Sequence, residues 1–176
     1  HILINNSGGP NGGPIVTAKE EDFINTFNRH LICNHILTKA VVPSMKVACY
    51  GRIINIISTS VKIPLNNLGV SNTIRGAVAS WSKTMANELG QFNITVNNVL
   101  PGATSTGRLK SIIENNANKK SVAIDDVEEE MKKEIPMKRF AEPSELANVV
   151  AFLASPAASY INGVNIPVDG GRTGAM

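Results

Sequence analysis

Segments typical of buried β-strands alternate with long amphipathic helices along this chain, and that alternation constrains the fold more than any other feature. Residues 52–57 are apolar almost throughout, which is the pattern of a parallel strand covered on both faces. Shorter apolar runs at residues 2–4, 94–100 and 164–168 have the length of strands. Because parallel strands need long crossover connections, this order predicts one α/β domain, residues 1–176, with a parallel sheet and right-handed crossovers.

Three segments between these strands have the periodicity of helices. The first covers residues 20–45 and follows Thr17 and Glu20, which have the spacing of a capping box. The others cover residues 70–89 and 143–154, the last of which begins with a proline. The apolar residues of the first helix form one stripe, which is made of Phe23, Phe27, Leu31, Ile32, Ile36 and Ala40.

The composition is that of an ordinary globular domain. The 176 residues are 43% hydrophobic and 18% charged, which suits one domain with one core. The net charge of +3 is spread along the chain, and this argues against nucleic-acid binding. No cluster of histidines and cysteines has the spacing of a metal site, so we expect no metal.

No apolar run approaches the roughly 18 residues that a membrane-spanning helix needs, and no signal-peptide pattern is present. We therefore expect a cytoplasmic protein that makes no contact with a membrane. Because the chain opens with His1 already inside a strand-like run, we also expect it to be a fragment of a longer domain.

Four short motifs follow one another along the chain: Asn5-Asn6-Ser7-Gly8, Asn55-Ile56-Ile57-Ser58, Asn97-Asn98-Val99-Leu100-Pro101-Gly102 and Val168-Asp169-Gly170-Gly171. In this order and at these spacings they resemble the short-chain dehydrogenase/reductase family, most of all its beta-ketoacyl carrier-protein reductase-like branch. The resemblance covers essentially the whole chain. It implies a Rossmann-type, doubly wound parallel sheet, of which the chain would supply the C-terminal two-thirds. It also implies NAD or NADP as cofactor and hydride transfer at a small carbonyl or alcohol substrate.

The resemblance places the cofactor beside two loops. Asn6, Ser7 and Gly8 match the loop that follows a strand close to the dinucleotide. Pro101, Gly102, Thr104 and Thr106 match the segment that meets the nicotinamide carboxamide, although a turn that simply ends a strand would look the same. The family's glycine-rich phosphate turn and the residue that selects NAD or NADP have no counterpart here. Residues 8–13 are rich in glycine, but Pro10 removes a donor and no helix follows directly.

The family's catalytic tyrosine and lysine are replaced. Ser58 matches the serine that holds the substrate oxygen, and Ser71, thirteen residues later, occupies the place of the tyrosine. Arg75 occupies the place of the lysine. A serine hydroxyl is a much weaker acid than a phenol, whose pKa is about 10, and arginine does not release its proton near neutral pH. Arginine can, however, bind a carboxylate or a phosphate through two parallel hydrogen bonds.

His30 falls where the family carries an asparagine that holds a water of its proton relay. A histidine at this place could shuttle protons, because its unperturbed pKa is about 6.5. The alternative interpretation is a partly buried helix histidine whose ring is satisfied by a backbone carbonyl.

Two functions remain open at this point. One is an oxidoreductase with an atypical site, in which Ser58 and Ser71 hold the substrate oxygen, Arg75 supplies charge and His30 or water delivers the proton. The other is a catalytically inactive protein that senses a cofactor or has a structural role. By the same resemblance, residues 103–140 correspond to a variable substrate lid, and the helices at 20–45 and 70–89 would pair copies of the chain into a homo-oligomer, a dimer or a tetramer.

Overall fold

The computed structural model describes residues 1–174 and has four parallel strands in the order β1-β2-β3-β4. The strands are β1 (Ile2–Asn5), β2 (Gly51–Ile56), β3 (Ile94–Pro101) and β4 (Asn165–Val168). Every neighbouring pair is parallel. The α/β fold with a parallel sheet, expected from the alternation of elements, is confirmed.

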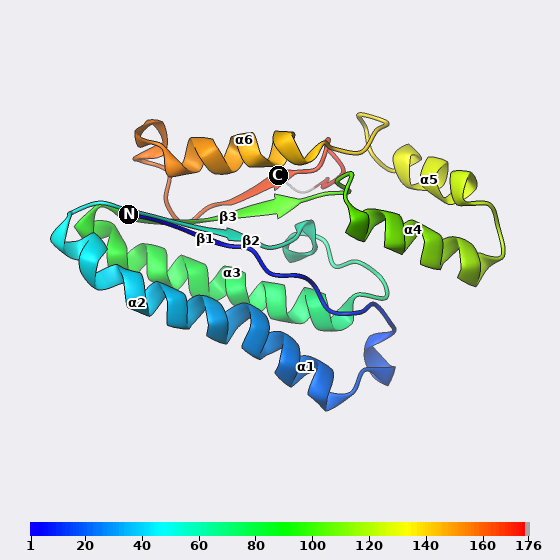
Figure 1. The fold of residues 1–176 in the computed structure, drawn as a ribbon, viewed down its shortest axis with the longest axis horizontal. Helices are drawn as coiled ribbons and strands as arrows, with labels where there is room; N and C mark the ends of the chain where they lie inside the picture. The colour runs from blue at the N-terminus through cyan, green and yellow to red at the C-terminus, as the bar shows by residue number, and fades with distance from the viewer. Residues whose placement is uncertain (175–176) are drawn as a thin grey trace.

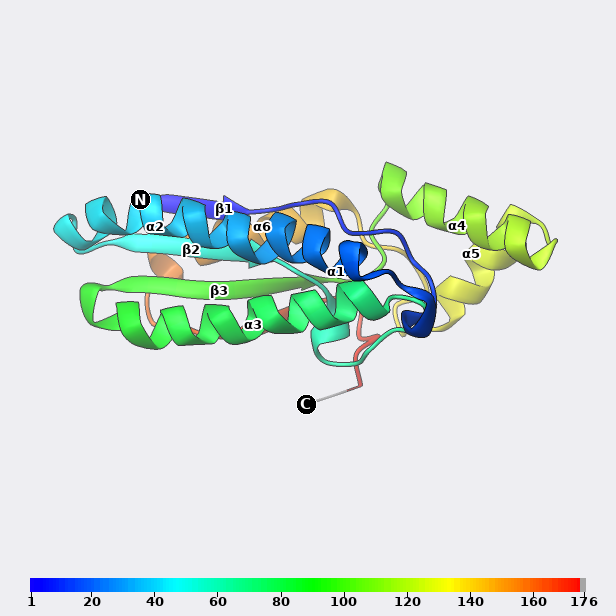
Figure 2. The ribbon, with the colours of Figure 1, turned by 90° about the horizontal axis from the view of Figure 1, so that it is seen from below.

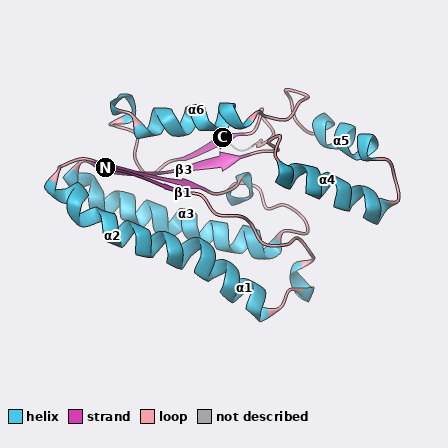
Figure 3. Cartoon of the chain, in the orientation of Figure 1, coloured by secondary structure: helices cyan, strands magenta, loops and turns pink. Residues whose placement is uncertain are grey.

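Helices cover both faces of the sheet (Figures 1 and 3). The helices of one face are α1 (Glu20–Phe27), α2 (Cys33–Val47) and α3 (Gly69–Leu89), and a π-helical turn, Asn28–Ile32, joins α1 to α2. On the other face lies α6 (Pro143–Ala154). Seen from below, α2 and α3 run along the sheet side by side (Figure 2). Among the described residues, no helix has the length and apolar character needed to cross a membrane.

The two faces require connections of opposite hand. Each strand is placed on the same side of the strand before it, so a crossover on one face of the sheet has the opposite hand to a crossover on the other face. The first two crossovers, through α2 and α3, pack against Ile53 and Val96 on one face. The β3-to-β4 connection places Leu153 of α6 against Ile54 and Val99 on the other face. The prediction that all crossovers are right-handed is therefore wrong for the last one. That connection contains two further helices, and its length frees it from the geometry of a short crossover.

Residues 103–140 are more regular than the sequence indicated. They contain α4 (Gly107–Lys120) as well as α5 (Ile124–Lys133), whereas only a helical patch near residues 127–134 was expected. The two helices pack on each other through a small cluster, made of Leu109, Ile113, Ala117 and Val127. They extend beyond the carboxyl ends of the strands (Figure 1).

The first helical segment buries a polar face. Thr26, His30, Asn34 and Thr38 recur every four residues and are all buried. Several residues of the apolar stripe point outward instead, among them Phe27, Ile32 and Ile36. The predicted capping box is wrong too, because the Thr17 hydroxyl donates to the Pro14 carbonyl and α1 begins after Lys19.

A row of asparagines crosses the sheet and holds the four strands in register. Asn5 donates to Asn55 over 2.8 Å, Asn55 to Asn98 over 3.0 Å, and Asn98 to Asn165 over 2.7 Å. Asn55 donates as well to the Ser82 hydroxyl of α3. Each bonded pair is also a register pair of the sheet. Since a buried amide is costly without partners, this row fixes which residues stand opposite one another.

Candidate active site

The carboxyl ends of β1, β2 and β3 meet at one edge of the sheet, where α3 begins (Figure 2). Residues after β1 carry Asn6, Ser7 and Gly8, and residues after β2 carry Ser58. In open α/β sheets this edge is where ligands bind. The topology therefore gathers the loops that hold the residues predicted from the sequence.

Ser7 and His30 are in direct contact. The Ser7 hydroxyl oxygen lies 2.7 Å from His30 Nδ1, although the two residues are 23 positions apart. His30 is 3% exposed and sits in the π-helical turn between α1 and α2. Such turns are frequent at functional sites because they shift one side chain out of helical phase. His30 Nε2 is buried and has no hydrogen-bond partner in residues 1–174.

The surroundings of His30 favour its neutral form. Burial, followed by the positive charges of Arg75 and Arg29, lowers the pKa of His30 to about 4, while the Gly8 carbonyl acts in the opposite direction. At neutral pH the imidazole is uncharged, with one nitrogen protonated and the other free to accept. Both interpretations of His30 find a contact here, because the Gly8 carbonyl acts on the ring and the Ser7 hydroxyl is a close side-chain partner.

Arg75 lies one helical turn after Ser71 on α3 and is 8% exposed. Its Nη1 donates to the Ile56 carbonyl at the end of β2 over 3.1 Å. Burial and the charge of Arg108 lower the pKa of Arg75 to about 10, so the guanidinium stays protonated near neutral pH. None of the ion pairs found in the described part of the chain involves Arg75.

Ser58 and Ser71 are both partly accessible. The Ser58 hydroxyl accepts from the Ser60 backbone N–H over 3.1 Å and caps the short turn Thr59–Val61. That bond leaves its own proton free to donate. Ser71 stands in the first turn of α3. A capping role for Ser58 is thus present, and it is compatible with a role toward a ligand.

The other predicted loop residues have structural partners. Asn6 and Gly8 are exposed. A Cβ on Gly102 would lie 2.7 Å from Asp169, so this position requires glycine for close packing. Thr104 donates to the Gly102 carbonyl, and Thr106 caps α4 by accepting from Leu109 N–H. Pro101 is the last residue of β3.

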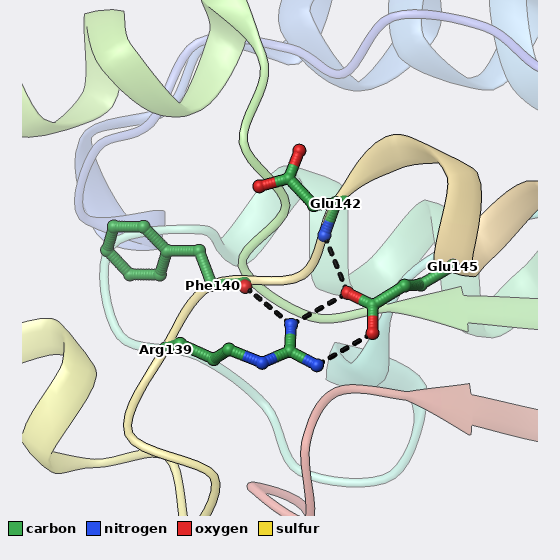
Figure 4. Close-up of polar contacts among 4 residues, drawn as sticks. All are labelled: Arg139, Phe140, Glu142 and Glu145. Atoms are coloured by element: carbon green, nitrogen blue, oxygen red, sulfur yellow. Dashed lines mark hydrogen bonds and ion pairs between the residues drawn. The ribbon is translucent and has the colours of Figure 1, made fainter.

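The base of the 103–140 segment is fixed to α6 by one ion pair (Figure 4). Arg139 contacts both carboxylate oxygens of Glu145, each over 2.7 Å, and Glu145 also accepts from the Glu142 backbone N–H. These bonds hold the pKa of the Glu145 carboxyl down at about 2. Beside them, Ala141 N–H donates to the Ala103 carbonyl. These contacts connect the end of the 103–140 segment to the start of α6 and to the residue after Gly102.

Two features beside the site were missed from the sequence. Arg108 of α4 donates to the Pro10 carbonyl over 2.8 Å, a contact between residues 98 positions apart that no local pattern announces. A pocket next to the first turn of α3 is lined only by uncharged residues and includes Ser60 and Asn72. Ser60 Oγ and Asn72 Oδ1 are buried without a partner in the described chain.

Comparisons with known proteins agree with this architecture. A family model described as "Enoyl-(Acyl carrier protein) reductase" matches residues 1–173. The NADPH-dependent reductase BacG of Bacillus subtilis (strain 168) is 36% identical over 170 residues, which cover 97% of this chain and 66% of BacG. The 3-oxoacyl-[acyl-carrier-protein] reductase FabG of Pseudomonas aeruginosa is 33% identical over 172 residues, with 97% and 64% covered. The chain thus spans slightly less than two-thirds of the length of these relatives.

Solved structures are similar over almost the whole chain. The structure of YwfH, an NADPH-dependent reductase involved in bacilysin biosynthesis, superposes with a TM-score of 0.93 and 34% identity, covering 99% of this chain and 67% of YwfH. An actinorhodin polyketide ketoreductase with NADPH also gives 0.93, with 28% identity and the same coverage. With the family model matched over residues 1–173 and the strands and motifs in the expected order, this chain belongs to the short-chain dehydrogenase/reductase family.

Proposed function

We propose that the protein is an NAD(P)-dependent oxidoreductase that acts on a small carbonyl or alcohol substrate through an atypical site. The observation that carries this proposal is the partly buried Ser7–His30 hydrogen bond at the carboxyl edge of the sheet, next to Arg75. A close serine–histidine contact between residues 23 positions apart is expected of a maintained site. Random loss of the tyrosine and lysine would not require it.

The described residues fit the nicotinamide end of the cofactor better than its phosphates. A Cβ on Gly8 would have no heavy atom within 4 Å, so the backbone there is open to a ligand. The glycine-rich loop that follows leads into a short turn, Ile15–Thr17, and within residues 1–174 no such loop runs directly into a long helix that could receive a pyrophosphate. Asn6, Ser7, Gly8, Pro101, Gly102, Thr104 and Thr106 are therefore the candidate contacts. The cofactor, once bound, would exchange a hydride with the substrate carbon.

Side chains of this protein would bind the substrate oxygen and transfer the proton. The hydroxyl protons of Ser58 and Ser71 hold the substrate oxygen, and the Arg75 guanidinium stabilises negative charge that develops on it. The neutral His30 ring accepts a proton at one nitrogen as it releases one at the other, and Ser7 connects the ring to the site. This relay replaces the direct proton donation that a phenol would give.

The test is turnover of NADPH and NADH with a panel of small carbonyl compounds, using the protein that contains this sequence. We expect His30→Ala to lower kcat by about 10²-fold, the usual contribution of a positioned acid or base. His35→Ala, an exposed histidine of α2, serves as the control. Full activity in a His30→Ala, Ser71→Ala double variant would contradict the proposal.

A second function, a catalytically inactive sensor or structural protein, is favoured by one observation. Neither tyrosine of the chain can replace the missing phenol: Tyr50 donates to the Ala154 carbonyl, and Tyr160 is fully exposed in a loop before β4. Tight NAD(P)H binding without turnover of any carbonyl compound would support this function over the first.

We also propose that copies of the chain pair through α1, α2 and α3. The buried face of the first helical segment is polar, whereas several of its exposed side chains are large and apolar: Ile24, Phe27, Ile32, Ile36 and Leu37. Exposed apolar patches of this kind are typical of interaction surfaces. Sedimentation of an Ile36→Asp variant, compared with Lys39→Asp on the same helix, tests it: the first should dissociate the oligomer and the second should not.

A further inference from the structure

Two arginines meet at the loop that follows β1, and no carboxylate is paired with either in the described chain. A Cβ on Gly9 would lie 3.6 Å from Arg75 Nη2, so one guanidinium stands at Gly9. Arg108 Nη2 donates to the carbonyl of the next residue, Pro10, over 2.8 Å. The two groups arrive from different elements, α3 and α4, at adjacent residues of one loop.

The charges that shift the pKa of Arg75 and of His30 all come from arginines. Arg108 disfavours the charge on Arg75, and Arg75 and Arg29 both disfavour a charge on His30. A buried arginine normally has an anionic partner, because its desolvation is otherwise uncompensated. Within residues 1–174, Arg75 donates to one backbone carbonyl, that of Ile56, which is uncharged and leaves most of its five donor hydrogens available.

We infer that Arg75 and Arg108 form a subsite for an anionic group, a carboxylate or a phosphate, of the substrate whose carbonyl is held by Ser58 and Ser71. The inference rests on the proposed function for the substrate's carbonyl and on the geometry of the arginine pair for its charge. Guanidinium groups suit this task because they bind planar oxyanions through two parallel hydrogen bonds, which an ammonium at the same place cannot do. The protein would then select 2-oxo acids or phosphorylated carbonyl compounds over neutral ketones.

Binding of a simple anion tests the subsite without any turnover. Inorganic phosphate is titrated into isotope-labelled protein, and the amide resonances of Gly9, Pro10's neighbour Asn11 and Arg108 are followed by NMR. We expect saturable shifts and a loss of affinity of about 10-fold in Arg108→Gln, because hydrogen bonds to charged groups are among the strong ones. Lys110→Gln removes the same charge from an exposed position of the same helix and should keep the affinity. Unsaturable shifts, or equal affinity in Arg108→Gln, would overturn the subsite.

The source of the anion is settled by kinetics. We compare kcat/KM for 2-oxobutanoate with kcat/KM for its uncharged methyl ester. In Arg108→Gln the ratio of the first to the second should fall about 10-fold, because KM for the acid increases while KM for the ester stays the same. If the variant instead weakens NADPH binding and leaves the ratio unchanged, the anion is a dinucleotide phosphate and the assignment to substrate is wrong. Saturable phosphate binding that depends on Arg108, in a protein without turnover, would support the subsite and overturn the proposed function separately.

Discussion

The two helical layers of this protein differ in how many polar side chains they bury against the sheet. On one face, Leu153 of α6 and Ala158 of the turn that follows α6 pack against Ile54 and Val99 of the sheet. This contact is apolar throughout. On the other face, the α1–α2 segment directs threonine, histidine and asparagine inward, and His30 reaches Ser7. An apolar layer needs only shape and volume, whereas a buried polar row needs a partner for every atom. The comparison indicates that α6 serves mainly stability, whereas the α1–α2 segment combines an apolar contact, in which Met45 packs against Ile53, with a buried polar row that leads to the site.

Truncation of the apolar layer should cause the largest loss of stability. Leu153 is fully buried, so Leu153→Ala should lower the free energy of unfolding by about 2 to 5 kcal/mol while leaving activity per folded molecule unchanged. Urea denaturation measures the first quantity and active-site titration normalises the second. Tyr160→Ala, fully exposed, should change stability by no more than about 0.5 kcal/mol. A change of kcat in Leu153→Ala would remove the distinction between the layers.

Restoring the family's residues on the polar side should change activity more than stability. Ser71→Tyr combined with Arg75→Lys supplies a phenol and an ammonium, and we expect turnover to rise by about 10²-fold. Ser71→Phe with Arg75→Lys has the same bulk and lacks the hydroxyl, so it should stay at the lower rate. Equal rates in the two double variants would show that the acid does not limit turnover.

Protonation of His30 should make the polar side sensitive to acid. Its pKa is about 4 in the folded protein and about 6.5 in the unfolded chain, so between these values only the unfolded chain carries the extra proton. The free energy of unfolding is therefore unaffected by His30 above pH 6.5. It decreases as the pH falls from 6.5 toward 4, by up to about 1.4 kcal/mol per pH unit. Denaturation at a series of pH values should show this slope in the wild type and in His35→Asn. Its persistence in His30→Asn would assign it to other groups.

The smallest effect is expected from an unpaired hydroxyl in the polar row. Thr38 Oγ1 is buried and has no partner in the described chain, so Thr38→Val removes an unsatisfied group at nearly constant volume. Stability should stay level or increase by up to about 1 kcal/mol, as measured by thermal unfolding. Thr73→Val removes an exposed hydroxyl that donates to the Gly69 carbonyl and should not be stabilising. A clear loss in Thr38→Val would mean that a water satisfies this hydroxyl.

Much of the fold could be predicted because its signals are local. The apolar run of β2 and the long helical periodicity of α3 each lie within one stretch of sequence. Helix α4 was missed because its buried stripe is only Leu109, Ile113 and Ala117 within an otherwise polar segment. The apolar stripe of the first helix was located correctly, but periodicity alone does not say which face the protein core covers.

The site was harder to predict because its contacts are distant in sequence. Counting positions against the family placed His30 and Arg75, and both lie at the sheet edge as a result of topology. The residues that contact His30 and Arg75 could not be identified by counting positions in the sequence. The Ser7–His30 bond depends on how β1 and the π-helical turn pack. The contact of Arg108 with the Pro10 carbonyl depends on how α4 packs against a loop 98 residues earlier in the chain.

The asparagine row across the sheet has a direction. In each of the three bonds, the amide nearer β1 donates to the amide nearer β4, so the amide dipoles add and the negative end lies at Asn5 Oδ1. Rotation of any one amide by half a turn would set oxygen against oxygen and nitrogen against nitrogen, which locks all members in a common orientation. Asn5 Oδ1 is buried and lacks a donor within the described residues. The amide oxygen of Asn5 therefore favours a hydrogen-bond donor as its partner. Because the amides of the row orient one another, the direction in which Asn5 presents this oxygen depends on the bonds that reach across the sheet to Asn165.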